Sequence, residues 1–251
     1  MRETDFVSGF ARGLKVIEAF EEAQPKMSIA DIARSTGLDR ATARRCLLTL
    51  SELGYADYDG KFFSLTPKIL RLGHAYLSAT PLTRIVQPFL DQLSEAVGQS
   101  ASVSVLDGTE IVYVARASQK RVMSINLMPG SRLPAYCASM GRVLLAALSE
   151  AEARDVIHRS TLKTFTDRTL TEPDALMAEF SRIRAQGYAV IDQELELGLC
   201  SIAVPLVNGR GRVVAALNIG APAAGGPAET LPERYLAPLQ QVALSLKPLL
   251  G

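Results

Sequence analysis

Residues 28–53 carry the clearest hydrophobic pattern of the chain, with apolar side chains recurring every three to four positions on both sides of Gly37. This spacing predicts two short helices. Ser28 suits the N-cap of the first helix, and Asp31 favours the helix start by its negative charge. Gly37 suits the turn because glycine adopts left-handed backbone angles at little cost. Asp39 suits the cap of the second helix.

The second of these helices separates apolar from basic residues. At about 100° per residue, its inward face is predicted to hold Ala43, Cys46, Leu47, Leu50 and Leu53. Its outward face holds Arg40, Arg44 and Arg45. An amphipathic helix predicted over 12–22 would pack behind the pair. A helix with a guanidinium-rich outer face fits the major groove of DNA, so the stretch predicts a helix-turn-helix.

A β-hairpin is predicted directly after this motif, because aromatic residues flank Asp59-Gly60. A hairpin in this place is a wing, and Lys61 beside its tip is suited to a phosphate or to the minor groove. We therefore predict a winged helix-turn-helix over residues 1–66. Proline is favoured at the first position of a helix, so Thr66-Pro67 starts a new one. We interpret residues 67–80 as a linker helix.

From Ser100 the hydrophobic period changes to two, which is typical of β-strands. Strands are predicted over 100–107, 110–118, 121–128, 188–192, 200–207 and 212–220, with hairpin turns at 107–109 and 208–211. Helices are predicted over 81–97, in the second half of 137–148, and over 150–159, 173–186 and 231–250, the last bent at Pro238. Elements in this order predict an α+β fold, with an antiparallel sheet and flanking helices, over residues 81–251.

The composition narrows the class of protein. Of 251 residues, 48% are hydrophobic, so a large core is expected. A net charge of +1 means that DNA binding must rest on a local basic patch. We expect no membrane span and no secretory signal, since no apolar run is long enough and the N-terminus carries acids. Three scattered cysteines fit neither a zinc site nor a disulfide framework, so we expect no metal, no cofactor and a cytoplasmic protein.

Several segments together resemble the IclR family of bacterial transcription regulators: SGFARGLKVIEAF, the helix-turn-helix and wing, and GYAVIDQELELGLCSIAVPL. The resemblance runs from about Phe6 to Pro222. Two further segments, LDGTEIVYVARAS and SRLPAYCASMGRVLLA, are most similar to the branch that controls aromatic-acid catabolism. Effectors in that branch include protocatechuate, 4-hydroxybenzoate and β-ketoadipate. The resemblance implies a GAF-like effector domain and homodimers, often arranged as dimers of dimers.

Arginine pairs with guanine edges or anchors on phosphate, so the basic helix face is the best candidate for the DNA surface. A pseudo-palindromic double-stranded operator would receive one such helix from each protomer. Thr42 suits a thymine methyl group or a phosphate, and the residues near the first helix suit phosphates. The predicted DNA contacts are Ser28, Arg34, Arg40, Thr42, Arg44, Arg45 and Lys61. The alternative is a basic helix face that only contacts solvent.

A pocket for a small carboxylate needs mostly apolar walls and a few placed polar groups. The loop before a helix starting near Arg142 offers backbone N–H groups that suit a carboxylate. The resemblance also places effector positions on this loop and in the segments near residues 192, 200 and 218. The predicted effector residues are Arg116, Ala138, Ser139, Met140, Gly141, Asp192, Cys200, Ser201 and Asn218.

Two questions stay open on the residues alone. Each of three arginines either neutralises the effector carboxylate or pairs with a nearby acid: Arg116, Arg132 and Arg142, against Asp192 or Glu194. Successive residues of a strand face opposite sides. Cys200 and Ser201 therefore cannot both face one pocket unless their strand bends.

The sequence gives little support for catalysis. Nucleophilic catalysis needs a positioned base, usually histidine, and His74 and His158 lie in no motif with a cysteine or serine. We therefore predict a DNA-binding transcriptional regulator of aromatic-acid metabolism and not an enzyme. Two alternatives are a ligand sensor that acts through protein contacts and a regulator of short-chain keto-acid metabolism. A third is a hydrolase or isomerase that uses Cys200.

Overall fold

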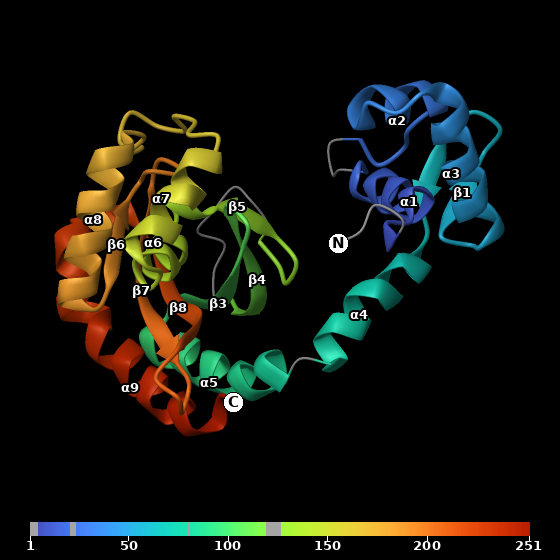
Figure 1. The fold of residues 1–251 in the computed structure, drawn as a ribbon. Helices are drawn as coiled ribbons and strands as arrows, with labels where there is room; N and C mark the ends of the chain where they lie inside the picture. The colour runs from blue at the N-terminus through green and yellow to red at the C-terminus, as the bar shows by residue number, and fades with distance from the viewer. Residues whose placement is uncertain (1–4, 21–23, 80, 119–126) are drawn as a thin grey trace. The chain divides into compact units, whose positions relative to one another are not determined.

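The chain folds as two units, Met1–Ala79 and Thr80–Gly251, whose elements are labelled in Figure 1. The structure, a computed structural model, describes residues 5–20, 24–79, 81–118 and 127–251. Within these ranges no helix combines the length and the apolar character that a membrane crossing requires. Helices and an antiparallel sheet occur together, which confirms the predicted α+β class.

Three helices build the first unit: α1 (Ser8–Glu18), α2 (Ile29–Thr36) and α3 (Arg40–Glu52). The predicted caps are confirmed. Ser28 and Asp31 form a capping box, Gly37 ends α2 with a φ of 69°, and the Asp39 carboxylate accepts a hydrogen bond from the Thr42 N–H. Helix α1 begins at Ser8 and ends at Glu18, so it starts and ends four residues earlier than predicted, and no side chain caps its start. Residues 21 and 22 of the predicted helix lie outside the described ranges.

The apolar faces of these helices meet in one core around Val16, Ile32, Ala43 and Leu47. Leu53, predicted to face inward, is 53% exposed because α3 ends one residue before it.

The predicted wing is present as strands β1 (Ala56–Tyr58) and β2 (Phe63–Leu65). Phe63 is buried in the core and also exchanges backbone hydrogen bonds with Met27, which ties the wing to the chain just before α2. Thr66 then caps a short 3-10 turn, η2 (Pro67–Ile69), that leads into α4 (Leu70–Ala79). The start of this helix at Pro67 agrees with the prediction.

The second unit contains one six-stranded antiparallel sheet in the order β5-β4-β3-β8-β7-β6. Its strands are β3 (Ser100–Asp107), β4 (Glu110–Ala117), β5 (Arg132–Pro134), β6 (Ala189–Asp192), β7 (Leu199–Val207) and β8 (Val213–Pro222). The predicted strand over 121–128 falls largely outside the described residues, and the last two of its residues belong to no strand.

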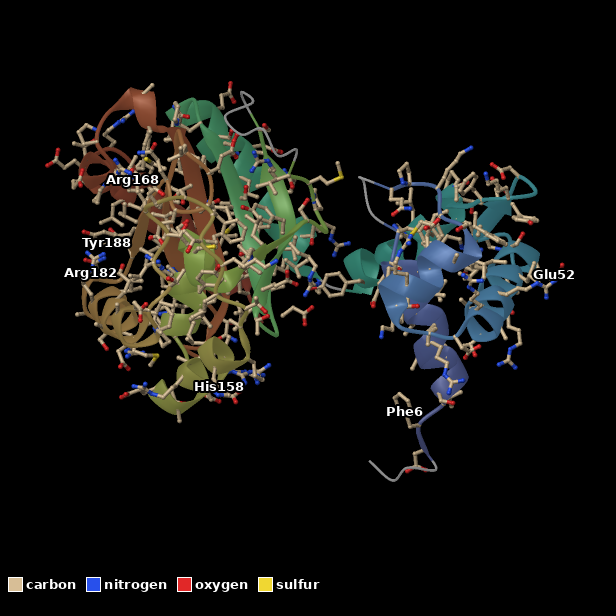
Figure 2. All side chains as sticks on the ribbon, turned by 90° about the horizontal axis from the view of Figure 1, so that it is seen from above. Phe6, Glu52, His158, Arg168, Arg182 and Tyr188 are labelled. Atoms are coloured by element: carbon tan, nitrogen blue, oxygen red, sulfur yellow. The ribbon has the colours of Figure 1, made fainter. Side chains whose placement is uncertain are left out.

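Helices cover both faces of this sheet, as Figure 1 shows. One face packs against α5 (Pro81–Val97) and α9 (Ala237–Leu246). The other face packs against α6 (Ser139–Ala146), with α7 (Glu150–Arg159) and α8 (Pro173–Gln186) outside it. His158, at the end of α7, lies at the surface (Figure 2).

The closing helix predicted over 231–250 is divided into three segments: a π-helical turn (Pro232–Leu236), α9, and a 3-10 turn (Lys247–Leu249). Each segment has a proline in its first two positions, which explains the divisions because proline removes a backbone donor. Pro238, where a bend was predicted, lies at the second position of α9, directly after the π-helical turn.

Candidate DNA surface and effector pocket

Helix α3 presents the basic surface that the sequence predicts. Arg40, Arg44 and Arg45 are all exposed. Thr42 differs from the prediction, because it is only 6% exposed and lies on the face that packs into the core. Its burial removes Thr42 from the surface that a groove can reach.

The other predicted DNA contacts differ in whether their polar groups already have partners within the protein. The Ser28 hydroxyl already donates to the Asp31 carboxylate at 2.6 Å, and the Arg34 guanidinium pairs with the same carboxylate. Both groups therefore hold the start of α2 as well as facing outward. Lys61 is exposed on the wing, with its ammonium 5.0 Å from the centre of the Phe62 ring.

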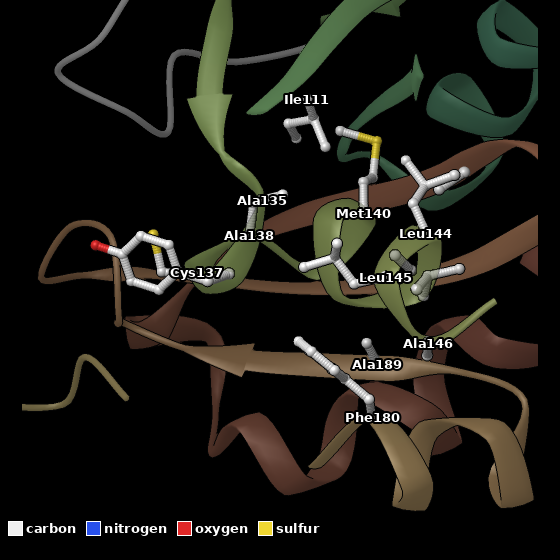
Figure 3. Close-up of a cluster of buried hydrophobic side chains, with 14 of the residues drawn as sticks. Ile111, Ala135, Cys137, Ala138, Met140, Leu144, Leu145, Ala146, Phe180 and Ala189 are labelled. Atoms are coloured by element: carbon white, nitrogen blue, oxygen red, sulfur yellow. The ribbon is translucent and has the colours of Figure 1, made fainter. Parts of the chain in front are cut away.

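A pocket opens between the sheet and the amino end of α6. Figure 3 shows the apolar packing around this end, with Met140 beside Ile111 and Ala138 near Ala135. Six of the predicted effector residues line the pocket: Arg116, Ala138, Ser139, Met140, Ser201 and Asn218. Sequence reasoning missed its other lining residues: Ser100, Tyr113, Leu133, Cys137, Ile191, Leu195, Leu199 and Gly220.

Polar side chains cross three neighbouring strands at the floor of this pocket. Arg116 on β4 is in register with Ser102 on β3, and Ser102 is in register with Asn218 on β8. The Arg116 guanidinium donates a hydrogen bond to the Ser102 hydroxyl at 3.0 Å. The next row on the same face joins Ser100 and Ser201 through the intervening Gly220. The pocket floor is therefore polar although it lies inside the fold.

Arg116 supplies the positive charge of the pocket. Among the described lining residues it is the one cation, and none of them carries a carboxylate. Burial lowers the pKa of Arg116 below its ordinary value, which reflects the cost of holding the charge away from water. Arginine nevertheless remains protonated in proteins. The pocket thus offers one uncompensated charge to an anion.

Three buried lining or neighbouring groups stay protonated. Burial raises the pKa of Tyr113 to about 12, so its phenol remains a hydrogen-bond donor. Burial likewise raises the pKa of Cys137 and of Cys200 to about 12. A cysteine nucleophile acts as the thiolate. These two thiols are therefore poor nucleophiles, which argues against a hydrolase that uses Cys200.

The helix behind the pocket begins at Ser139, three residues before the predicted start near Arg142. Ala138 occupies the N-cap, and no side chain caps this end. The Ser201 hydroxyl donates to the Ser139 hydroxyl at 2.9 Å, which connects β7 to the first turn of α6. Two predicted effector residues from distant segments are thus brought together.

Three predicted effector residues lie outside the pocket. Cys200 points into the opposite layer beneath α5 and α9, while Ser201 lines the pocket, so the strand alternates without a bend. Asp192 is on the Cys200 side and pairs with Arg168. Gly141 sits against backbone and offers no surface to a ligand.

Two of the three candidate arginines pair with acids. The buried Arg142 guanidinium contacts the Glu194 carboxylate at 2.6 Å and donates to the Tyr136 carbonyl. Burial raises the pKa of Glu194, and Arg142 opposes that shift. The exposed Arg132 pairs with Asp107 and Glu110. Only Arg116 of the three is left for an effector.

A separate groove runs along the edge strand β6. Arg168 and Arg182, labelled beside Tyr188 in Figure 2, line it together with acids that pair with them: Glu179 with Arg182, and Asp192 with Arg168. Because these charges compensate one another, we assign the anion to the pocket around Arg116 and not to this groove.

Gly141 gives a direct test of how tightly α6 is placed. A Cβ atom at this position would lie 2.1 Å from the Ala135 carbonyl oxygen, which is backbone and cannot turn away. We expect Gly141→Ala to destabilise the second unit by about 1–3 kcal/mol or more, as overpacking does, and to weaken effector binding. Urea unfolding measures the first effect. Gly209→Ala, where a Cβ meets no atom within 4 Å, is the matched control. Equal stability of the two variants would contradict this account of the packing.

Comparison with known protein families identifies the family of this protein. The model described as IclR helix-turn-helix domain matches residues 10–60, and the model described as Bacterial transcriptional regulator IclR C-terminal matches residues 74–247. The chain belongs to the IclR family. It is therefore a DNA-binding transcriptional regulator, and the predicted resemblance is confirmed.

Individual members of the IclR family are similar over most of the chain. The Pca regulon regulatory protein of Pseudomonas putida is 48% identical, over 93% of this chain and 81% of its own. A Microbacterium hydrocarbonoxydans IclR homolog complexed with 4-hydroxybenzoate is 25% identical, with a TM-score of 0.76 over 96% of this chain and 98% of its own. The inducer-binding domain of an Acinetobacter PobR double mutant, complexed with 3-hydroxybenzoic acid, is 31% identical, with a TM-score of 0.63 over 67% and 98% of the two chains.

Proposed function

We propose that this IclR regulator binds the carboxylate of a small organic acid at Arg116 and transmits the binding to its DNA-binding unit. The observation that carries the proposal is the uncompensated guanidinium in a pocket with apolar walls and hydroxyl groups. Such a site suits a carboxylate, since a charge held away from water is stabilised by an opposite charge. Relatives complexed with hydroxybenzoates support an aromatic acid.

In this proposal each segment has its own task. Residues 1–66 read the operator, residues 67–80 link the units and carry the coupling, and residues 81–251 bind the effector. Arg40, Arg44 and Arg45 enter the major groove, while Ser28, Arg34 and Lys61 contact phosphates. The protein acts in the cytoplasm as a homodimer or as a dimer of dimers. Each dimer places its two α3 helices on a pseudo-palindromic operator. The effector acts by binding one arrangement of the dimer more tightly than the other.

Operator binding tests the DNA surface. On a fragment from the promoter region upstream of its own gene, we expect affinity to fall steeply with salt, because each neutralised phosphate releases counterions. Arg44→Ala is expected to weaken binding by about 10- to 100-fold if Arg44 contacts a guanine. Fluorescence anisotropy over a salt series measures both. Effector affinity, measured by calorimetry, is expected to stay unchanged.

Arg159→Ala is the matched control, because Arg159 is an exposed arginine of the second unit that pairs with Asp155. It should bind the fragment like the wild type. Salt-independent binding, or equal behaviour of the two variants, would instead favour a sensor that acts through protein contacts. If β-ketoadipate or a short-chain keto acid releases the protein from the fragment and aromatic acids do not, the aromatic effector is wrong. The role as a DNA-binding regulator would still hold.

A further inference from the structure

We infer that Asn218 recognises a hydroxyl group of the effector, so that the pocket selects a monocarboxylate that also carries a hydroxyl. This inference rests on the proposed function and adds the second group of the ligand. The sequence alone places Asn218 among the predicted effector residues. The structure leaves its side-chain oxygen as a hydrogen-bond acceptor without a partner among the described residues.

The side-chain oxygen of Asn218 lacks a partner. Asn218 is 8% exposed, and its Oδ1 atom is fully buried without a hydrogen bond to any described residue. Buried polar atoms are nearly always paired, because an unpaired one loses its bonds to water and gains none. Asn218 lines the same pocket as Arg116. A ligand that offers a donor at this point supplies the missing bond.

A hydroxyl group is the donor that fits. Carboxylates and ketones only accept hydrogen bonds, whereas a hydroxyl both donates and accepts. A hydroxyl therefore pairs with the Asn218 amide whichever of its two ends faces the pocket. The carboxylate of the ligand is already assigned to Arg116. The two polar ends of the effector thus differ, one an anion and the other a neutral hydroxyl.

The charge of the pocket excludes a second carboxylate. The described lining residues supply one guanidinium. Arg142, the next buried cation, is held by Glu194 at 2.6 Å. The uncapped amino end of α6 adds only about half a charge. A second buried carboxylate would lack a full partner, which is strongly unfavourable.

The walls favour a ring between the two ends. Arg116 and Asn218 lie two strands apart in one row of the sheet, which places their Cα atoms about 10 Å apart at the usual strand spacing. Apolar side chains enclose the space above this row: Leu133, Met140, Ile191, Leu195 and Leu199. A flat aromatic ring with a carboxylate at one end and a hydroxyl at the other matches this arrangement.

Calorimetry with four probes tests the inference on the full chain: 3- and 4-hydroxybenzoate, 4-fluorobenzoate and adipate. Fluorine has a similar size to hydroxyl but carries no proton. We expect the better hydroxybenzoate to bind the wild type about 10-fold more tightly than 4-fluorobenzoate, since that is the value of one good hydrogen bond. In Asn218→Leu we expect this ratio to fall to about 1. Adipate, a dicarboxylate without a hydroxyl, is expected to bind most weakly.

Ser104→Ala is the matched control. The Ser104 oxygen is also buried and unpaired on β3, but Ser104 does not line the pocket. This variant should keep the wild-type ratio. Equal affinity for hydroxybenzoates and 4-fluorobenzoate in the wild type, or tighter binding of adipate, would overturn the inference even if Asn218→Leu does not fold. If all acids bind but the hydroxyl has no effect, the proposed function stands. If none of the acids binds, both fail.

Discussion

Arg142→Met is expected to destabilise the second unit by about 3–5 kcal/mol, because it leaves the Glu194 carboxylate buried without its counter-charge. The pair contacts at 2.6 Å, and the same carboxylate also accepts a hydrogen bond from the Leu170 N–H. Arg142 therefore joins α6 to the turn after β6 and to the segment before α8. Urea unfolding followed by circular dichroism measures the loss.

The control for this prediction is Arg154→Met, because Arg154 pairs with Glu150 and Asp174 at the surface. Exposed pairs contribute about 0–1 kcal/mol, so this variant should unfold nearly like the wild type. Replacing both Arg142 and Glu194 by apolar residues should recover part of the loss, since no charge is then left unpaired. A mild effect of Arg142→Met, similar to that of the control, would show that Glu194 reaches water.

Arg116→Gln is expected to weaken binding of the acidic effector by about 30-fold or more, because the carboxylate then enters the pocket without a counter-charge. Arg116→Lys keeps the charge but not the two-pronged geometry, so it should recover only part of the affinity. Calorimetry with a hydroxybenzoate measures both variants. Operator affinity in the absence of effector should not change.

Arg132→Gln serves as the comparison for Arg116→Gln. Arg132 is half exposed, pairs with Asp107 and Glu110, and does not line the pocket. It should bind the effector like the wild type. Loss of affinity in both variants would show that general electrostatic attraction, and not contact with Arg116, holds the acid. Unchanged affinity in Arg116→Gln would place the carboxylate elsewhere in the pocket.

Local rules were enough to predict much of the first unit. Capping, turn formation and helix periodicity act between residues close in sequence, and Ser28, Gly37 and Asp39 perform the predicted roles. Thr42 shows where such rules end. Its place near the start of a helix with three outward arginines suggested exposure, but the structure leaves it only 6% exposed. How far neighbouring elements cover a residue is set by tertiary packing, which a local pattern does not report.

The pocket was only partly predictable because both faces of its sheet are covered by helices. A period of two shows that residues alternate, but it identifies the inner face only when the other side meets water. The alternation over 100–107 therefore did not show whether Ser100, Ser102 and Ser104 lie inside or outside, and the structure buries all three. Alternation did correctly separate Cys200 from Ser201, because that question concerns relative orientation alone.

The partners of the arginines were not predictable for a similar reason. Arg142 and Glu194 are 52 residues apart in sequence, and the fold decides that they meet. Asp192 lies two residues from Glu194 yet pairs with Arg168 from another segment. Of the two acids proposed as partners, only Glu194 pairs with one of the three candidate arginines, while Arg132 pairs with Asp107 and Glu110.

The unpaired oxygens of Ser104 and Asn218 imply that thermal stability and effector recognition place opposite demands on the sheet. Apolar replacements at such positions often stabilise a protein, because stability is rarely at its maximum where a site must bind something. A directed-evolution experiment that selects for heat tolerance alone should therefore accumulate apolar residues at these two positions. Changes at Ser104 would leave effector binding intact. Changes at Asn218 would raise the thermal stability of the regulator but remove its recognition of the effector.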